Sequence, residues 1–232
     1  WDPIGNRLIV SARPVHYKVS HVTIPKNASD CWWEFDPAEN RWYGVKDGPF
    51  PRLGQTTWLP KQNKVISFKE GNIPVAYYDP QKKSFEKLSF KGKRPKGYTL
   101  KTVYDPKRNR VLLISHNDKG EKLWAYDPID NKWTGIATKN TPQGGLYGSW
   151  ALDEGADKLV ALYPEDPQKG FSNPGGRSKT WLCDLKTLDW QALPMETSAP
   201  YLGMNYKMTY EPRHKVTLLV ARNEVWSFKA PL

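Results

Sequence analysis

A short pattern recurs along this chain: an aromatic residue, then Asp-Pro, then Trp or Phe five residues after the proline. Within Lys122–Ile136, Tyr126-Asp127-Pro128 is followed by Trp133. An aspartate at the start of a turn accepts backbone hydrogen bonds, and the proline presets φ, so each copy predicts a β-hairpin. Further copies lie at Phe35-Asp36-Pro37, Tyr78-Asp79-Pro80 and Cys183-Asp184-Leu185, and a shortened one at Trp226-Ser227-Phe228.

A second unit alternates with the first and consists of an aromatic or apolar strand end, a polar turn, and a strand rich in Val, Ile and Leu. Such short continuous apolar runs are typical of strands buried on both faces. Pro- and Gly-containing segments precede four of these units, and they indicate sharp bends. The turns lie at Trp1–Arg7, Trp58–Lys64, Tyr104–Arg110, Leu152–Lys158 and Tyr210–Lys215; the bends lie at Pro51–Gly54, Pro95–Tyr98, Pro142–Gly145 and Pro200–Gly203.

Together the two units give four antiparallel strands, a to d, repeated five times, and no stretch has sustained helical periodicity. We therefore predict an all-β fold, a single β-propeller domain of four-stranded antiparallel blades. The expected blades are approximately 1–46, 47–90, 91–137, 138–193 and 194–232. The first and last are incomplete, because the pattern supplies 18 strands in the order three, four, four, four, three. We favour a closed five-bladed ring; the alternative is part of a larger propeller completed by another chain or an extension.

These features resemble the kelch-repeat, galactose-oxidase-like propeller superfamily. The resemblance rests on the aromatic-Asp-Pro hairpin, the Pro-x-Arg-x-Gly segment Pro51–Gly54 and the Asp-Pro-x-x-Asn-Arg turn Asp105–Arg110. The Gly-Gly pair usual at the end of strand b is absent; Ile114-Ser115 is one of its replacements. The resemblance implies a copper site only where the ligands carry over. No matching set of Tyr, Cys and His is evident, so we expect no cofactor.

The net charge of +11 and a pI near 9.5 favour an acidic partner. We expect a protein partner or an anionic polysaccharide and not nucleic acid, because the longest basic stretch is only Lys91–Arg94. No apolar run is long enough for a transmembrane helix, and no leader is evident. Cys31 and Cys183 fall in blades that are not neighbours, so we expect no disulfide between them. A secreted, periplasmic or extracellular location is favoured, with a cytoplasmic one left open.

The b–c and d–a loops lie on one face of a propeller and are the long, diverse loops here, so we place the functional site on that face, at the channel mouth. Aromatic and cationic side chains there suit sugar stacking with carboxylate binding, or protein anchoring; packing between innermost strands is the alternative role of the tyrosines. The candidate binding residues are Arg52, Lys96, Tyr98, Lys101, Tyr147, Arg177, Tyr201 and Tyr206.

Three histidines, His16, His21 and His116, are expected on the same face and are weak candidates for metal binding or general-base catalysis, with Tyr147 as a further catalytic candidate. The alternative is that they share no site. Most tryptophans occupy repeat-equivalent positions and are expected to pack between blades. Only Trp32, beside Trp33 at a strand start, is expected to expose one face.

Two functions follow from the sequence. The favoured one is a non-catalytic, kelch-like binding module that holds a protein or an anionic glycan through the b–c/d–a face, because no catalytic motif is evident. The alternative is a lyase-type enzyme acting on an acidic polysaccharide, with His and Tyr moving protons and Arg or Lys neutralising the substrate.

Overall fold

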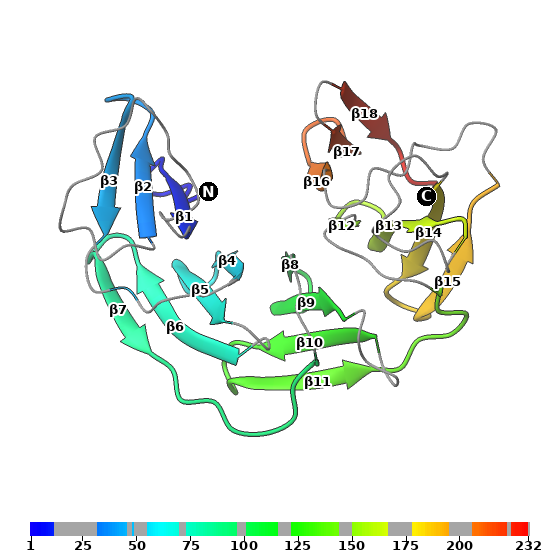
Figure 1. Cartoon of the computed structure of the whole chain (residues 1–232), viewed down its shortest axis with the longest axis horizontal. Coiled ribbons are helices and arrows are strands. Elements are labelled where there is room, and N and C mark those ends of the chain that lie inside the picture. The colour runs from blue at the N-terminus through cyan, green and yellow to red at the C-terminus, as the bar shows by residue number, and fades with distance from the viewer. Residues whose placement is uncertain are drawn as a thin grey trace.

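The computed structural model describes residues 1–11, 32–45, 48, 55–69, 73–96, 101–115, 122–143, 150–166, 178–194, 206–221 and 224–231. Five antiparallel sheets, the blades, follow one another around an arc, each with its first strand nearest the axis (Figure 1). Their order in space is their order in sequence. The chain is therefore an all-β propeller, as the repeat predicts.

Within the residues that the structure describes, the five blades contain three, four, four, four and three strands, the predicted order. Blade 1 comprises β1 (Leu8–Ser11), β2 (Trp32–Asp36) and β3 (Arg41–Val45); blade 2 comprises β4 (Gln55–Leu59), β5 (Lys64–Lys69), β6 (Ile73–Asp79) and β7 (Ser84–Lys87); blade 3 comprises β8 (Thr102–Asp105), β9 (Arg110–Ile114), β10 (Leu123–Asp127) and β11 (Lys132–Ile136); blade 4 comprises β12 (Trp150–Asp153), β13 (Lys158–Pro164), β14 (Ser178–Asp184) and β15 (Asp189–Ala192); blade 5 comprises β16 (Tyr206–Glu211), β17 (Val216–Ala221) and β18 (Glu224–Phe228). No helix that could span a bilayer occurs in the described part of the chain.

The predicted Asp turns form as expected. Asp127 Oδ1 accepts hydrogen bonds from the backbone N–H groups of Ile129 (2.7 Å) and Asp130 (3.2 Å), and Asp36, Asp79 and Asp184 repeat this arrangement. The residue that ends each turn has a positive φ, as at Asn131 (50°), and asparagine tolerates that conformation well. These turns therefore fix the register of each hairpin through local interactions.

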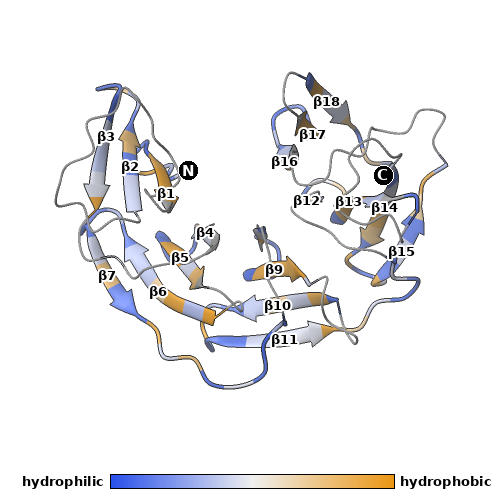
Figure 2. Ribbon diagram, viewed as in Figure 1, coloured by the Kyte–Doolittle hydropathy of each residue, from blue (hydrophilic) through white to orange (hydrophobic). Residues whose placement is uncertain are grey.

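In the described part of the chain, buried apolar side chains form four clusters, and each cluster lies between two consecutive blades. Ile66 and Phe68 of blade 2 pack with Leu113 and Tyr126 of blade 3, for example, and Phe68 meets Tyr126 edge-on at 5.4 Å between ring centroids. The other clusters join blades 1 and 2, 3 and 4, and 4 and 5. Figure 2 shows the apolar segments concentrated on β1, β5, β9 and β13. The core therefore lies between the sheets, and each inner blade contributes both of its faces.

Strand register repeats the same cross-strand row of side chains in four blades. In blade 3 the row is Val111, Tyr126 and Trp133, which are 0%, 0% and 2% exposed. The equivalent rows are Leu8–Phe35–Trp42, Val65–Tyr78–Phe85 and Leu159–Cys183–Trp190. We call it the aromatic row, and in each inner blade it faces the preceding blade. In blade 1, however, Leu8 is 38% and Trp42 is 39% exposed.

Trp32 is buried, so the prediction that it exposes one face is wrong. Its side chain points toward blade 2, where it packs against Tyr78 and Phe85 at centroid distances of 5.7 and 5.2 Å. The neighbouring Trp33, which points to the opposite face of β2, is half-buried. Alternation along the strand was expected correctly, but the sequence did not indicate which of the two residues faces a neighbouring blade.

Charged side chains also bridge neighbouring blades. The Arg108 guanidinium donates two hydrogen bonds to the Asp157 carboxylate, at 2.9 and 3.0 Å, and thereby joins the a–b turns of blades 3 and 4. This contact holds the pKa of Asp157 below its usual value. Between blades 1 and 2, Tyr78 Oη donates to the buried carboxylate of Glu34 at 2.5 Å, and Arg7 donates to the same carboxylate at 2.9 Å.

Replacing equivalent tryptophans should destabilise the protein unequally. Trp133→Ala removes a buried ring and should lower the free energy of unfolding by about 3–5 kcal/mol. Trp42→Ala removes a partly exposed ring and should cost less than about 2 kcal/mol. Urea unfolding monitored by circular dichroism measures both losses, and equal losses would contradict the difference in packing.

Candidate functional site

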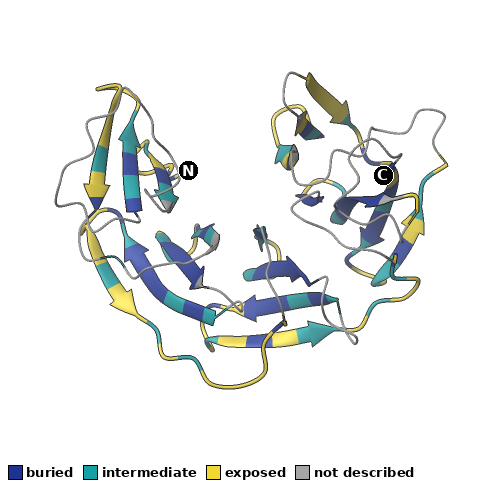
Figure 3. Cartoon of the chain, viewed as in Figure 1, coloured by how far each residue is buried: buried dark blue, intermediate teal, exposed yellow. Residues whose placement is uncertain are grey.

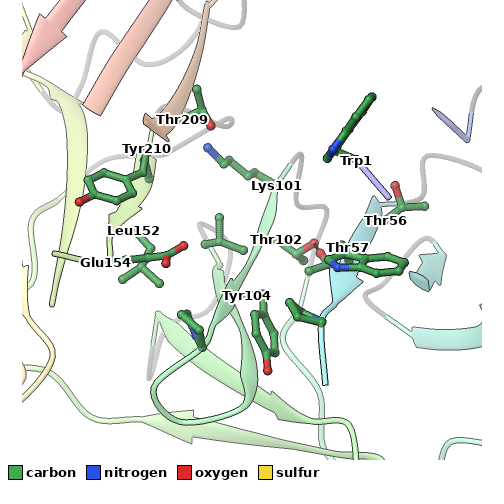
Figure 4. A pocket seen from close by; sticks show the side chains of 15 residues that line it. Trp1, Thr56, Thr57, Lys101, Thr102, Tyr104, Leu152, Glu154, Thr209 and Tyr210 are labelled. Atoms are coloured by element: carbon green, nitrogen blue, oxygen red, sulfur yellow. Dashed lines mark hydrogen bonds between the residues drawn. The ribbon is translucent and has the colours of Figure 1, made fainter. Parts of the chain in front are cut away.

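A cavity of about 550 Å³ lies on the propeller axis among β4, β8, β12 and β16 (Figure 4). Five residues at equivalent repeat positions, one from the segment leading into blade 1 and one from each of blades 2 to 5, contribute to its lining: Trp1, Trp58, Tyr104, Leu152 and Tyr210. Each lies next to an a–b turn, directly before the residue at which the turn begins. We call these five residues the axial collar. Four of them are aromatic, so they give the cavity wall a large apolar surface. The Tyr104 hydroxyl donates to Asn109 Oδ1 at 2.7 Å, and in Figure 4 the oxygens of Tyr104 and Tyr210 point away from the cavity.

Threonine hydroxyls form much of the remaining wall. Thr57 of β4 and Thr102 of β8 share a short side-chain hydrogen bond across the boundary between blades 2 and 3. Thr56 and Thr209 line the cavity as well, and Thr209 is solvent-exposed. Because these hydroxyls belong to innermost strands that are held in sheets, the hydrogen-bonding groups they present are preorganised.

Lys101 reaches across the axis from the start of β8. Its ammonium donates to the backbone carbonyl of Trp150 at 2.5 Å and to that of Met208, so one side chain connects blades 3, 4 and 5. Burial lowers the pKa of Lys101 to about 7, and the nearby Lys207 acts in the same direction. Lys101 therefore carries a proton that is unusually easy to lose near neutral pH.

Glu154 brings a carboxylate to the same cavity from the turn after β12. Burial raises its pKa, and the neighbouring Asp105 and Asp153 raise it further. Among the described lining residues, Lys101 is the one basic side chain and Glu154 the one acidic side chain. The cavity is consequently close to electrically neutral, in contrast to the strongly basic chain as a whole.

The structure places three of the predicted site residues. Lys101 lines the axial cavity; Lys96 is exposed in the segment after β7, and its carbonyl accepts a hydrogen bond from Ser115 Oγ at 2.8 Å. Tyr206 begins β16, where only the backbone is described. Arg52, Tyr98, Tyr147, Arg177, Tyr201, His16, His21 and His116 lie outside the described residues, so their grouping stays a prediction.

The axial collar and the threonines are not among the predicted site residues, although the repeat contains a signal for the collar. Aligning the five a–b turns places Tyr104 and Tyr210 at the same position of two innermost strands, and the innermost strands of a propeller surround its axis. The collar lies beside the a–b turns. The predicted site instead uses the b–c and d–a loops at the opposite end, most of which fall outside the described ranges.

Within the described residues, no three His, Cys, Asp or Glu side chains gather in a way that could hold a metal ion. Cys183 is a buried free thiol whose pKa is raised to about 12, chiefly by burial. It occupies the aromatic row of blade 4, at the position held by Tyr126 in blade 3. Cys183 is therefore a core residue, not an activated nucleophile.

The chain is a β-propeller, and solved structures agree with that class. It is similar to a putative TolB from Agrobacterium tumefaciens, with a TM-score of 0.58, 13% identity, and coverage of 99% of this chain and 73% of that one. A chain of a nidogen/laminin complex gives a TM-score of 0.53 at 10% identity, with 85% of this chain and 67% of that one covered.

The extracellular domain of a putative one component system from B. thetaiotaomicron gives a TM-score of 0.51 at 12% identity, with 86% of this chain but only 24% of that one covered. No family model and no curated protein matches the chain. The similarity of these structures supports the propeller fold. At identities this low it does not test the kelch-repeat resemblance, which stays a prediction.

The low pKa of Lys101 should make stability depend on pH. Because the folded-state pKa is about 7 and an unfolded lysine titrates near 10.5, the unfolded state binds more protons between these values. The free energy of unfolding should therefore rise from pH 7 to pH 9.5, by up to about 1.4 kcal/mol per pH unit from this group. Lys101→Met should flatten the rise, whereas Lys132→Met, at an exposed lysine on β11, should keep it. Chemical denaturation across this range measures the slope, and identical slopes for the two variants would refute the assignment.

Proposed function

We propose that this propeller is a non-catalytic binding module for a protein partner and that the axial cavity receives a short segment of that partner. The observation that carries the proposal is the axial collar. Its four aromatic residues stand at the end of a rigid channel, beside preorganised threonine hydroxyls. Tyrosine and tryptophan are enriched among the residues that dominate protein–protein binding energy. Hydroxyl groups supply both donors and acceptors, which a peptide backbone requires.

Charge favours a protein segment over an anionic glycan. A polyuronate or a sulfated sugar needs several unpaired cations, whereas the lysine at this cavity already donates to two carbonyls and Glu154 would repel an anion. The same reasoning counts against the lyase-type alternative, whose substrate is a polyanion. The remaining surface charge of the chain suits an acidic protein, since it would accelerate association without direct contact in the cavity.

Two finer parts of this proposal rest on the sequence. The repeat pattern resembles that of kelch propellers, and a location outside the cytoplasm is the favoured setting. The predicted b–c/d–a surface, at the opposite end of the axis from the collar, would then provide a second contact for the partner.

Filling the cavity should abolish peptide binding. Thr209→Trp places an indole in the cavity from an exposed position on β16, so it should weaken binding at least tenfold without large loss of stability. Peptides selected from a display library on the immobilised chain serve as probes, and calorimetry measures their dissociation constants.

Thr134→Trp on the outer strand β11 is the matched control and should leave binding unchanged, because Thr134 is exposed away from the axis. Selected peptides that bind Thr209→Trp as tightly as the parent chain would place the binding surface elsewhere. Displacement of these peptides by heparin or polyuronate fragments at physiological salt would instead support the glycan alternative.

A further inference from the structure

Exposed apolar side chains gather at the two ends of the arc. Eight large apolar side chains are exposed in the described residues, and all but Ile129 belong to blade 1 or blade 5 or to the segment leading into blade 1: Trp1, Ile4, Leu8, Trp42, Val220, Val225 and Trp226. Figure 3 shows exposure along β18 and β3, which contrasts with the buried inner strands of blades 2 to 4. Exposed apolar surface of this extent marks a contact site.

The open face of blade 1 is the aromatic row. Leu8 and Trp42 are 38% and 39% exposed, while the equivalent Val111 and Trp133 of blade 3 are 0% and 2% exposed. In blade 3 this row packs against blade 2. The open face of blade 1 thus has the composition of an inter-blade surface, but no blade of the described chain precedes it.

The open face of blade 5 is the other face of the repeat, which lies opposite the aromatic row and carries aliphatic side chains. Val220 pairs with Val225 across β17 and β18, and they are 44% and 66% exposed. The equivalent pair in blade 3, Ile114 and Leu123, is 3% and 1% exposed because it packs against blade 4. Blade 5 therefore presents the surface that a following blade covers elsewhere in the ring.

These two faces stand on either side of one opening in the arc (Figure 1). An object that covers both must offer an aliphatic face to blade 1 and an aromatic row to blade 5. A blade of this repeat has these two faces in that order, as blade 3 demonstrates. We propose that one further four-stranded blade, carried on the same polypeptide, fills the opening and completes the ring. All four observed inter-blade interfaces join consecutive blades of one polypeptide, and the new contacts would continue that series.

The proposal is independent of the axial cavity and is tested by extending the chain with a blade of known chemistry. A copy of residues 83–137, which supplies β7 as the fourth strand of blade 5 and then the sequence of blade 3, is appended after Leu232. Labelling with a tryptophan-modifying reagent, read by mass spectrometry, then compares Trp42 with the buried Trp190. In the 232-residue chain Trp42 should react at least about fivefold faster than Trp190. In the extended chain the two rates should agree within about twofold, and the melting temperature should rise by about 5 °C or more.

A matched control carries Ile114→Lys and Leu123→Lys in the appended copy only, so that charges occupy the face meant for blade 1. It should leave Trp42 as reactive as in the unextended chain. Three outcomes would overturn the proposal. Trp42 could be as unreactive as Trp190 in a monomeric 232-residue chain, which means that blades 1 and 5 close on each other. Light scattering could show a dimer that protects Trp42, which assigns the opening to a second copy. The extended chain could leave Trp42 reactive and the melting temperature unchanged.

Discussion

Packing of one blade against the next is the interaction on which the whole structure depends. A blade buries little within itself, since its side chains alternate between two faces and both faces are apolar. Val111 and Leu113 of β9 contact blade 2, whereas Leu112 and Ile114, the residues between and after them, contact blade 4. An isolated blade would expose all of these side chains, so stability depends on neighbours on both sides, as in other repeat architectures.

Because each blade depends on its neighbours, the polar bridges join one blade to another. Arg108 and Asp157 join the turns of blades 3 and 4, Glu34 and Tyr78 join blades 1 and 2, and Lys101 joins three blades at the axis. Each partner is partly or fully buried, so the pairing has to be complete. Directional contacts between blades fix the rotation of one sheet relative to the next, which apolar packing alone specifies less strictly. The relative positions of the axial collar residues depend on that rotation.

The fold was predictable because its signals are local. The Asp turns are made within four residues, and Asp127 accepts the hydrogen bonds that its sequence context predicts. The site was less predictable because it is assembled from different blades: Tyr104 and Tyr210 line the same cavity only because the ring places their strands around one axis. The burial of Trp32 likewise depends on Tyr78 and Phe85 in another blade, and alternation along one strand carries no information about them.

Hydrogen exchange followed by mass spectrometry tests the central role of inter-blade packing most directly. If each blade is stabilised by two neighbours, amides of β9, β10 and β13 should be the best protected, and those of β1 and β18 should exchange at least about tenfold faster. Blades that are stable on their own would instead show uniform protection from β1 to β18, and that result would contradict the account.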